Sequence, residues 1–448
     1  MSVKRIWPVV VLACIVILAG GAIPSDAARP RSGSLGRVLA PATYHLGPEV
    51  QISTPSSPVD ADRHQPVVAH DWQHHEYLVV WHNQWTGSRD IYAQRMSESG
   101  ERVGPWFAVS SGPNDRSQPA VAYNATNDEY LVVWMYEASA DVYEIWGKII
   151  SWNGPGTTPE FRIMQWANRS FWSPRVAWNS YRNEYLVVWN AFDTTTSFPP
   201  GLPHDIAGYR ISADGVVQNA GSPLILTSYA YPHQVDLTYN VAKDEYFLAF
   251  VVVHTQVSTG NDVYGLRVGW DGSPVNPPGL IHIFDLAKNQ NAPAVTTNEQ
   301  DRYMVVWEHE YSSTDHDIYG REYDANGNPV GSYFAIASWT EEDTVPDVAA
   351  NGASREWLAV WQRELPGGSG YSIHGFRWGS SGSGVNAYLF DVANWTFVEA
   401  KAPAVAADIP GYLIVYEEVI APAKQHIYGR TWWPEVVYLP LMLRAYTG

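Results

Sequence analysis

The dominant pattern along the chain is a run of apolar residues that returns seven times and ends in a large aromatic residue. Its clearest form is Tyr-Leu-Val-Val-Trp, preceded by a polar turn and, before that, by a proline and a few apolar residues. The closing aromatic recurs every 53 to 61 residues, at Trp81, Trp134, Trp189, Phe250, Trp307, Trp361 and Tyr416. A regular period of this size, built from β-branched and aromatic residues, predicts an array of similar β-sheet units.

Each repeat divides into four predicted strands. The first strand follows the proline, which is tolerated there because its missing N–H is not yet needed. The second strand is the aromatic run, which is apolar on both faces, as a strand buried between stacked sheets must be. The third strand reads Ile-Tyr-Gly or a near copy, and the fourth resembles Phe334-Ala335-Ile336. Because glycine weakens a strand, its return in the third strand predicts close approach by a large aromatic side chain of the neighbouring repeat.

The seventh repeat lacks a fourth strand, and a matching segment lies near the other end of the chain. Residues 46–53 match residues 103–110 in spacing and residue type. An N-terminal strand that completes the last blade closes a ring and leaves only short, protected edges, whereas an open solenoid needs capping repeats. We therefore predict an all-β protein, a seven-bladed β-propeller with four antiparallel strands per blade, over residues 46–431.

The first 27 residues have the pattern of a secretory signal peptide. Lys4 and Arg5 provide a positive start, an apolar stretch follows over 6–23, and small residues lead to a cleavage site near Ala27. The alternative is a lipid anchor at Cys14, although the residues directly after Cys14 are apolar. We expect a secreted, extracellular or cell-surface protein.

Two further segments flank the predicted propeller. Residues 28–45 are expected to form a linker, and residues 432–448 an apolar tail that is too short to span a bilayer. The tail is similar to short apolar tails of some exported bacterial proteins, so it is either a sorting signal or a docked terminus. We expect no integral membrane span after removal of the signal peptide.

Composition limits the partners and the chemistry. The formal net charge is −18, which repels phosphate backbones and argues against nucleic acid or an anionic membrane as the partner. Cys14 is the only cysteine, so cleavage near Ala27 removes all thiol and disulfide chemistry. The sequence contains no phosphate-binding loop and no nucleophile elbow. We expect a monomer without a cofactor.

The repeat resembles those of a known group of proteins. The Tyr-Leu-Val-Val-Trp run, the Asp-Ile-Tyr-Gly-x-Arg pattern and the following Gly-containing turn look like the repeats of secreted bacterial β-propeller proteins, over residues 46–431. The turn at residues 212–215 is also similar to the Asp-box of sialidases, but the threonine and tryptophan that complete an Asp-box are missing. The resemblance implies the propeller fold and export.

Departures from the repeat gather in the third and fourth units, on the rim formed by the loops of variable length. Loops that vary on a rigid scaffold often carry binding residues, and exposed aromatic rings can stack on sugar rings. The candidate ligand-binding residues are Trp166, Trp172, Phe198, Tyr229, Tyr231 and His254. They favour a glycan or polysaccharide ligand. The alternatives are a protein partner, because Trp and Tyr also anchor protein interfaces, and aromatic residues that only fill the space between blades.

Carboxylates suggest a second possible chemistry. Glu308 and Glu417 follow the second strand onto the same rim, and two carboxylates across a cleft can hydrolyse a glycosidic bond. A further acidic position precedes the third strand in five repeats, at Asp90, Glu144, Asp205, Asp262 and Asp317. We expect these side chains to accept hydrogen bonds from loop N–H groups, because the sequence lacks a calcium-loop pattern and the histidines lack metal-ligand spacing. We therefore expect no metal site, and a binding or scaffold protein rather than an enzyme.

Overall fold

A computed structural model describes most of the chain between Tyr44 and Pro434. The described residues are 44–53, 62–85, 87–156, 158–166, 169–193, 205–218, 220–228, 231–254, 260–275, 279–284, 288–352, 354–379, 387–393, 398–408, 411–421 and 424–434. The predicted signal peptide, most of the predicted linker and residues 435–448 of the predicted tail lie outside these ranges. The described part of the chain has no helix long and apolar enough to cross a membrane.

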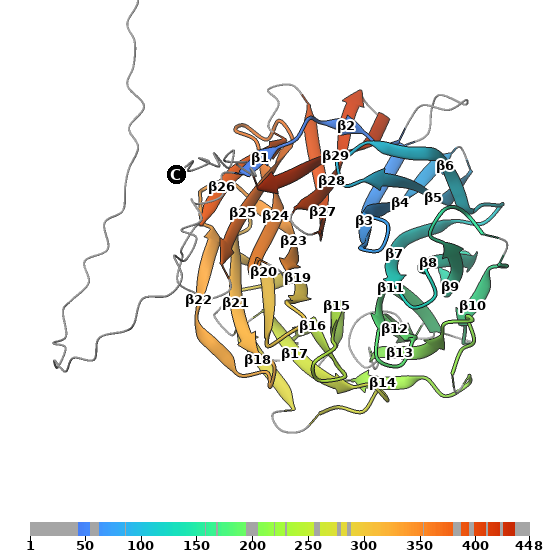
Figure 1. The fold of residues 1–448 in the computed structure, drawn as a ribbon. Coiled ribbons are helices and arrows are strands. Elements are labelled where there is room, and N and C mark those ends of the chain that lie inside the picture. The colour runs from blue at the N-terminus through green and yellow to red at the C-terminus, as the bar shows by residue number, and fades with distance from the viewer. Residues whose placement is uncertain are drawn as a thin grey trace, which may run out of the picture. The chain divides into compact units, whose positions relative to one another are not determined.

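Seven antiparallel sheets form a ring, with one sheet per sequence repeat (Figure 1). Blade 1 contains β3 (Asp62–Asp71), β4 (Glu76–Trp85), β5 (Ser88–Ser97) and β6 (Arg102–Ser110). Blade 2 contains β7 (Arg116–Asn124), β8 (Glu129–Ser139), β9 (Val142–Ser151) and β10 (Phe161–Met164). Blade 3 contains β11 (Arg169–Asn179), β12 (Glu184–Asp193), β13 (Asp205–Ser212) and β14 (Leu224–Thr227).

The remaining blades repeat this order. Blade 4 contains β15 (Pro232–Asn240), β16 (Glu245–Val253), β17 (Asn261–Gly269) and β18 (Leu280–Phe284). Blade 5 contains β19 (Gln290–Thr297), β20 (Arg302–Ser312), β21 (Asp315–Asp324) and β22 (Pro329–Ala337). Blade 6 contains β23 (Asp343–Asn351), β24 (Glu356–Glu364), β25 (Tyr371–Gly379) and β26 (Tyr388–Ala393). Blade 7 contains β27 (Glu399–Ala407), β28 (Tyr412–Ala421) and β29 (Lys424–Pro434).

The N-terminal segment completes blade 7, as predicted. Both β1 (Tyr44–Leu46) and β2 (Val50–Gln51) pair antiparallel with β29, in a register that places Val50 opposite Gly429. The next residue, Ile52, is fully buried and belongs to the cluster that joins blades 7 and 1. We call the junction of blades 7 and 1 the seam. The predicted seven-bladed propeller, closed by the N-terminal strand, is therefore confirmed.

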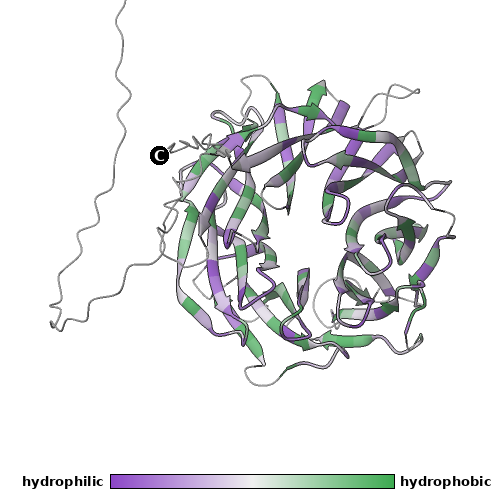
Figure 2. Cartoon of the chain, in the orientation of Figure 1, coloured by the Kyte–Doolittle hydropathy of each residue, from purple (hydrophilic) through white to green (hydrophobic). Residues whose placement is uncertain are grey.

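The core lies between neighbouring blades. Within the described residues there are seven clusters of buried apolar side chains, one at each blade junction. The second strand of each blade supplies side chains to both of its junctions, which explains why Tyr130, Leu131, Val132, Val133 and Trp134 are all buried. Hydrophobic and hydrophilic residues alternate along other strands around the ring (Figure 2).

The glycine of the third strand has a different cause from the one predicted. A Cβ on Gly147 would lie 2.9 Å from Cδ1 of Ile163, and a Cβ on Gly375 would lie 2.5 Å from the ring of Phe390. Both crowding side chains come from the fourth strand of the same blade. The prediction of an aromatic residue from the neighbouring unit was therefore wrong. The crowding atoms belong to the glycine's own blade: they come from the fourth strand at Gly147 and Gly375, and from the second strand at Gly208 and Gly265.

Candidate functional site

A cavity of about 990 Å³ lies at the centre of the ring, lined by the first strands of all seven blades. Each of these strands contains a β-bulge, and the residue at the bulge has a positive φ between 45° and 53°. These residues are Gln65, Gln118, Ser173, Gln234, Ala292, Val345 and Ala402. A left-handed conformation is unusual for residues other than glycine, above all for a β-branched valine. Because the bulge occurs in all seven first strands, it is a regular structural feature of the strands that line the cavity.

The two candidate catalytic glutamates hold this wall together. The backbone N–H of Gln65 donates to Glu417 at 2.7 Å, and that of Val345 donates to Glu308 at 2.6 Å. Each bond joins one blade to the next, and both carboxylates are buried, with exposed fractions of 3 % and 9 %. Burial raises the pKa of Glu308. Glu308 and Glu417 belong to blades 5 and 7, so blade 6 stands between them.

Three charged residues occupy one equivalent position around the cavity, two residues after the positive-φ residue. Arg175 Nε lies 3.5 Å from Asp236 Oδ1, and Asp236 Oδ2 accepts the N–H of Val295 at 2.9 Å. Asp347 repeats the arrangement by accepting the N–H of Val405 at 2.8 Å. Burial raises the pKa of Asp347 to about 7, with the negative charge of Asp236 contributing. These side chains link blades while they line the cavity.

A polar sector of the same cavity lies at blades 7, 1 and 2. It includes His64, His82, Arg89 and Lys401. The rings of His64 and His82 are 5.3 Å apart between centroids, and burial lowers the pKa of His82 to about 3, with His64 and Arg89 contributing. His82 is therefore neutral at physiological pH and can act as a hydrogen-bonding group.

The predicted tryptophans are exposed, and one of them is part of an aromatic cluster. Trp166 and Trp172 are 50 % and 42 % exposed. The Trp172 ring lies 4.3 Å from Phe192 and 6.1 Å from Tyr143 of blade 2, both in edge-to-face arrangements. We call Tyr143, Trp172 and Phe192 the aromatic platform. It bridges blades 2 and 3.

A serine fixes one side of this platform. Ser170 Oγ donates to the carbonyl of Asp141 at 2.9 Å and accepts the N–H of Tyr143 at 3.0 Å. These bonds tie the turn between β8 and β9 of blade 2 to the first strand of blade 3. The platform is consequently held on two rigid sheets.

The other predicted binding residues lie elsewhere or outside the described residues. His254 Nε2 pairs with Asp262 Oδ2 at 2.9 Å within blade 4. Tyr231 has a positive φ of 56° at the start of blade 4. Phe198 and Tyr229 lie outside the described ranges. The described contacts therefore join Trp172 to blade 2, and His254 to its own blade.

The acidic position before the third strand is used in several ways. Asp90 accepts the N–H of Gly112 at 3.0 Å, as predicted for this group. Glu144 instead accepts from the indole N–H of Trp146 at 2.7 Å, and Asp205 accepts from Arg169 at 2.9 Å. The position thus takes both backbone and side-chain donors, and these bonds stabilise the rim.

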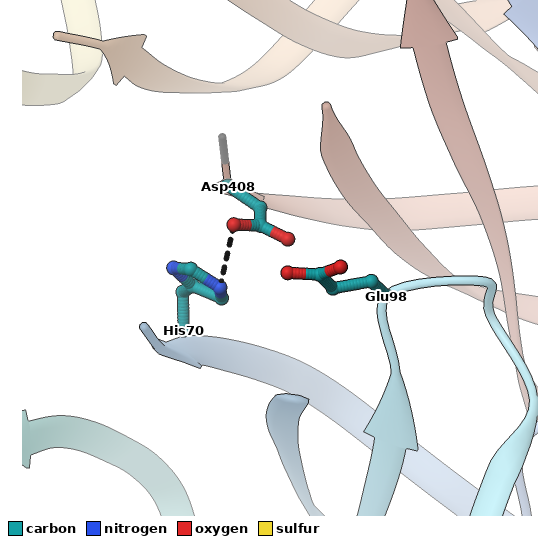
Figure 3. Close-up of side chains that lie close together, drawn as sticks. All are labelled: His70, Glu98 and Asp408. Carbon is teal, nitrogen blue, oxygen red and sulfur yellow. Dashed lines mark ion pairs between the residues drawn. The ribbon is translucent and has the colours of Figure 1, made fainter. Parts of the chain in front are cut away.

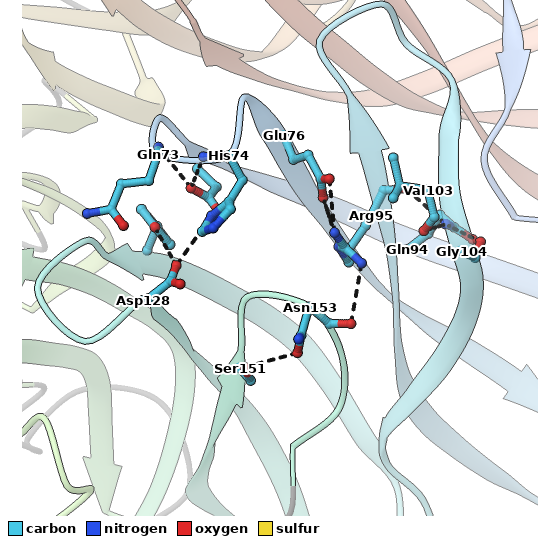
Figure 4. A network of polar contacts seen from close by, with 12 residues as sticks. Gln73, His74, Glu76, Gln94, Arg95, Val103, Gly104, Asp128, Ser151 and Asn153 are labelled. Atoms are coloured by element: carbon cyan, nitrogen blue, oxygen red, sulfur yellow. Dashed lines mark hydrogen bonds and ion pairs between the residues drawn. The ribbon is translucent and has the colours of Figure 1, made fainter.

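Two His–carboxylate clusters, which were not predicted from the sequence, lie where the first strands of the blades end, away from the rim that carries Trp172. One contains His70, Glu98 and Asp408, and the other contains Asp71, His74 and Asp128 (Figures 3 and 4). Asp71 and His74 are only three residues apart, but the other members come from distant parts of the chain, so no spacing motif marks the clusters. One signal was present: the residue that ends the first strand or directly follows it is asparagine in blades 2 to 6 but aspartate, at 71 and 408, in blades 1 and 7.

No protein-family model matches the sequence, and no curated protein matches it. Solved structures do match the fold. A puromycin hydrolase complexed with PGG is 14 % identical with a TM-score of 0.51, over 80 % of this chain and 52 % of its own. The β-propeller domain of the Trilobed protease from Pyrococcus furiosus is 12 % identical with a TM-score of 0.46, over 83 % and 93 %. Trypanosoma rangeli sialidase is 9 % identical with a TM-score of 0.43, over 83 % and 55 %.

The likeness to the puromycin hydrolase shows the propeller fold alone, because the identity is low. The chain spans about half the length of the puromycin hydrolase. Propellers support many unrelated functions, so a function has to be argued from the residues of this chain.

Proposed function

We propose that this propeller is a binding protein that recognises a glycan or polysaccharide through the aromatic platform. The observation that carries the proposal is the exposed ring of Trp172, which lies next to Tyr143 and Phe192 at the junction of blades 2 and 3. A sugar ring presents C–H groups that can stack on an exposed indole ring such as that of Trp172, and polar neighbours fix its orientation.

Polar groups surround the platform. Burial raises the pKa of Tyr143, and the negative charges of Glu137 and Asp141 raise it further, whereas Arg89 lowers it. Carboxylates accept hydrogen bonds from sugar hydroxyls, whereas they repel anionic polymers. Together with the net charge of −18, this favours a neutral or cationic glycan.

Rigidity supports the same proposal. Ser170 holds the blade 2 turn against blade 3, so the rings need little ordering when a ligand binds. A preorganised surface loses less conformational entropy on binding and therefore binds more tightly. The apolar N-terminal stretch with its small-residue end supports action outside the cell, where such polymers are found.

The test is binding of the purified protein to a panel of soluble neutral, cationic and anionic polysaccharides, followed by calorimetry on the best ligand. We expect Trp172→Ala to weaken binding by about tenfold or more, since a stacked ring contributes roughly 1–2 kcal/mol. Trp72→Ala is the matched control, because Trp72 is 57 % exposed but lies at the opposite end of an inner strand. It should bind like the wild type.

Two results would overturn the proposal. One is equal affinity of the Trp172→Ala variant and the wild type for the best glycan. The other is the absence of any glycan binding, together with a protein partner that the wild type captures and Trp172→Ala loses. That second outcome would assign the platform to a protein interface.

A further inference from the structure

The seam carries three potential metal ligands from separate parts of the chain. His70 is the penultimate residue of β3, Glu98 lies in the turn between β5 and β6 of blade 1, and Asp408 follows β27 of blade 7 (Figure 3). His70 Nε2 lies 2.9 Å from Asp408 Oδ1, and one ligand atom from each of the three residues lies within 4.8 Å of the others. The three side chains therefore converge on one point between the first and last blades.

The two carboxylates of this cluster face each other. Burial raises the pKa of Glu98, and a hydrogen bond with Asp408 raises it further. Two ionised carboxylates with oxygens within 4.8 Å of each other repel unless a proton or a cation lies between them. The imidazole of His70 adds a nitrogen ligand to the same point.

The backbone around the cluster holds the donors in place. The N–H of Glu98 donates to the carbonyl of His75 at 3.2 Å, and the N–H of Asp408 donates to the carbonyl of Gly411 at 2.8 Å. The His75 ring contacts the Glu98 carboxylate. A residue that hydrogen-bonds to a ligating carboxylate orients it for the metal, and His75 is placed to do so.

The side chains of the neighbouring cluster, Asp71, His74 and Asp128, are already engaged in contacts that link blades 1 and 2. Asp71 Oδ1 accepts the N–H groups of Gln73 and His74, both at 3.0 Å. The His74 ring stacks on Trp152 at 3.6 Å, and its Nδ1 lies between Asp71 and Asp128, at 2.9 and 3.3 Å (Figure 4). These contacts already satisfy the donors and acceptors of the cluster, so it links blades 1 and 2 as an ion pair.

We propose that His70, Glu98 and Asp408 bind a divalent transition-metal ion of the zinc class, which ties blade 1 to blade 7. One imidazole nitrogen with two carboxylates suits Zn²⁺, Co²⁺ or Mn²⁺. Ca²⁺ and Mg²⁺ prefer oxygen ligands alone and are expected to bind more weakly here. Water would complete the coordination of the ion.

Binding at this point stabilises the closed ring. The ligands come from both ends of the described chain, and they lie together only when blade 7 has closed on blade 1. An ion that binds only the folded state raises the free energy of unfolding by an amount that grows with its concentration. The site would thus add a second link across this junction, beside the N-terminal segment that completes blade 7 and leads into blade 1.

The test uses the purified protein after dialysis against a chelator. Calorimetric titration with ZnCl2, MnCl2 and CaCl2 gives affinity and stoichiometry, and thermal unfolding gives the stabilisation. We expect one equivalent of Zn²⁺, tighter than Ca²⁺, with a rise in Tm that excess chelator reverses. Binding should weaken at acidic pH, because metal ligands must be deprotonated to bind the ion.

Asp408→Asn is the decisive variant. It restores the asparagine that blades 2 to 6 carry at this position, so folding is expected to be preserved. Zn²⁺ affinity should fall about 10- to 100-fold or more on loss of this ligand. Asp71→Asn makes the same exchange in the neighbouring cluster and should bind Zn²⁺ like the wild type.

Three outcomes would overturn the proposal: no Zn²⁺ binding by the wild type, equal binding by Asp408→Asn, or loss of binding in Asp71→Asn instead. Should Asp408→Asn fail to fold, Glu98→Gln replaces it, since Glu98 lies in a turn with 27 % of its side chain exposed. Its equal binding of Zn²⁺ would count against the site in the same way.

Discussion

The seam and the interior junctions of the propeller solve the same packing problem with different residues. At an interior junction, Asn179 ends the first strand of blade 3. Its Oδ1 accepts the N–H of Arg182 at 2.9 Å, and its Nδ2 donates to Asp244 of blade 4 at 3.0 Å. At the seam, Asp408 occupies this position and pairs with His70 of blade 1 at 2.9 Å.

The difference follows from hydrogen-bonding capacity. An asparagine side chain both accepts and donates, so it can hold its own turn and reach the next blade without help. An aspartate only accepts and therefore requires a donor or a cation. Blade 1 supplies three histidines in this region, His70, His74 and His75, and two of them contact the exchanged aspartates. At both the seam and the junction of blades 1 and 2, an aspartate in place of asparagine is therefore accompanied by a histidine that contacts it.

The largest expected effect concerns the closing strands. Deletion of residues 44–53 removes β1, β2 and the buried Ile52, so the free energy of unfolding should fall by more than about 4 kcal/mol. Chemical unfolding followed by tryptophan fluorescence measures this change. Ile336→Ala is the control, because Ile336 packs on Gly320 in blade 5 as Ile52 packs on Gly429 in blade 7. A deletion no more harmful than this substitution would show that the ring is not closed by these strands.

The closure could be predicted because it depends on a linear pattern. Residues 46–53 repeat the spacing of a fourth strand, and the seventh repeat lacks that strand, so matching the two requires only the sequence. The exposure of Trp172 was also consistent with prediction, since it falls where the repeat changes.

The clusters could not be predicted in the same way. His70 and Asp408 are adjacent only because the ring brings the first blade against the last, and no local period encodes that contact. The bulge at Val345 could not be predicted either. A positive φ contradicts the local preference of valine, so this backbone conformation is imposed by tertiary packing. Likewise, the structural bonds of Glu308 and Glu417 could not be predicted, because their backbone N–H partners lie on other blades.

A second prediction transfers the seam residue to an interior junction. Asn179→Asp should lower the free energy of unfolding by about 1–3 kcal/mol at pH 7, because the new carboxylate cannot donate to Asp244 and repels it. The loss should shrink on acidification, when the two carboxylates share a proton. Urea unfolding at pH 4 and pH 7 measures both effects. Equal stability of variant and wild type at pH 7 would show that the donated bond of Asn179 is dispensable.

A third prediction concerns Glu98 in the metal-free protein. Its pKa is raised by burial and by Asp408, so the stability it contributes is present at low pH and is lost as pH rises through its folded pKa. Glu98→Gln should therefore raise the free energy of unfolding at pH 8 by up to about 1 kcal/mol, with no difference near pH 4. In saturating Zn²⁺ the sign should reverse, because the variant has lost a ligand. Urea unfolding in chelator and in Zn²⁺ compares the two, and an unchanged sign would argue against metal ligation by Glu98.

The smallest expected effect is that of Asp71→Asn. Asp71 accepts the N–H groups of Gln73 and His74 through Oδ1, and an asparagine keeps that acceptor. Its new amide can donate to Asp128 of blade 2, as Asn124 donates to Asn183 one junction further on at 2.9 Å. The variant gives up the contact between Oδ2 and His74, which is 26 % exposed and retains Asp128 as a partner. We expect a change in the free energy of unfolding within about 0.5–1 kcal/mol at pH 7. A loss of several kcal/mol in urea unfolding would contradict this, and would mean that the aspartate of blade 1 is as specialised as Asp408.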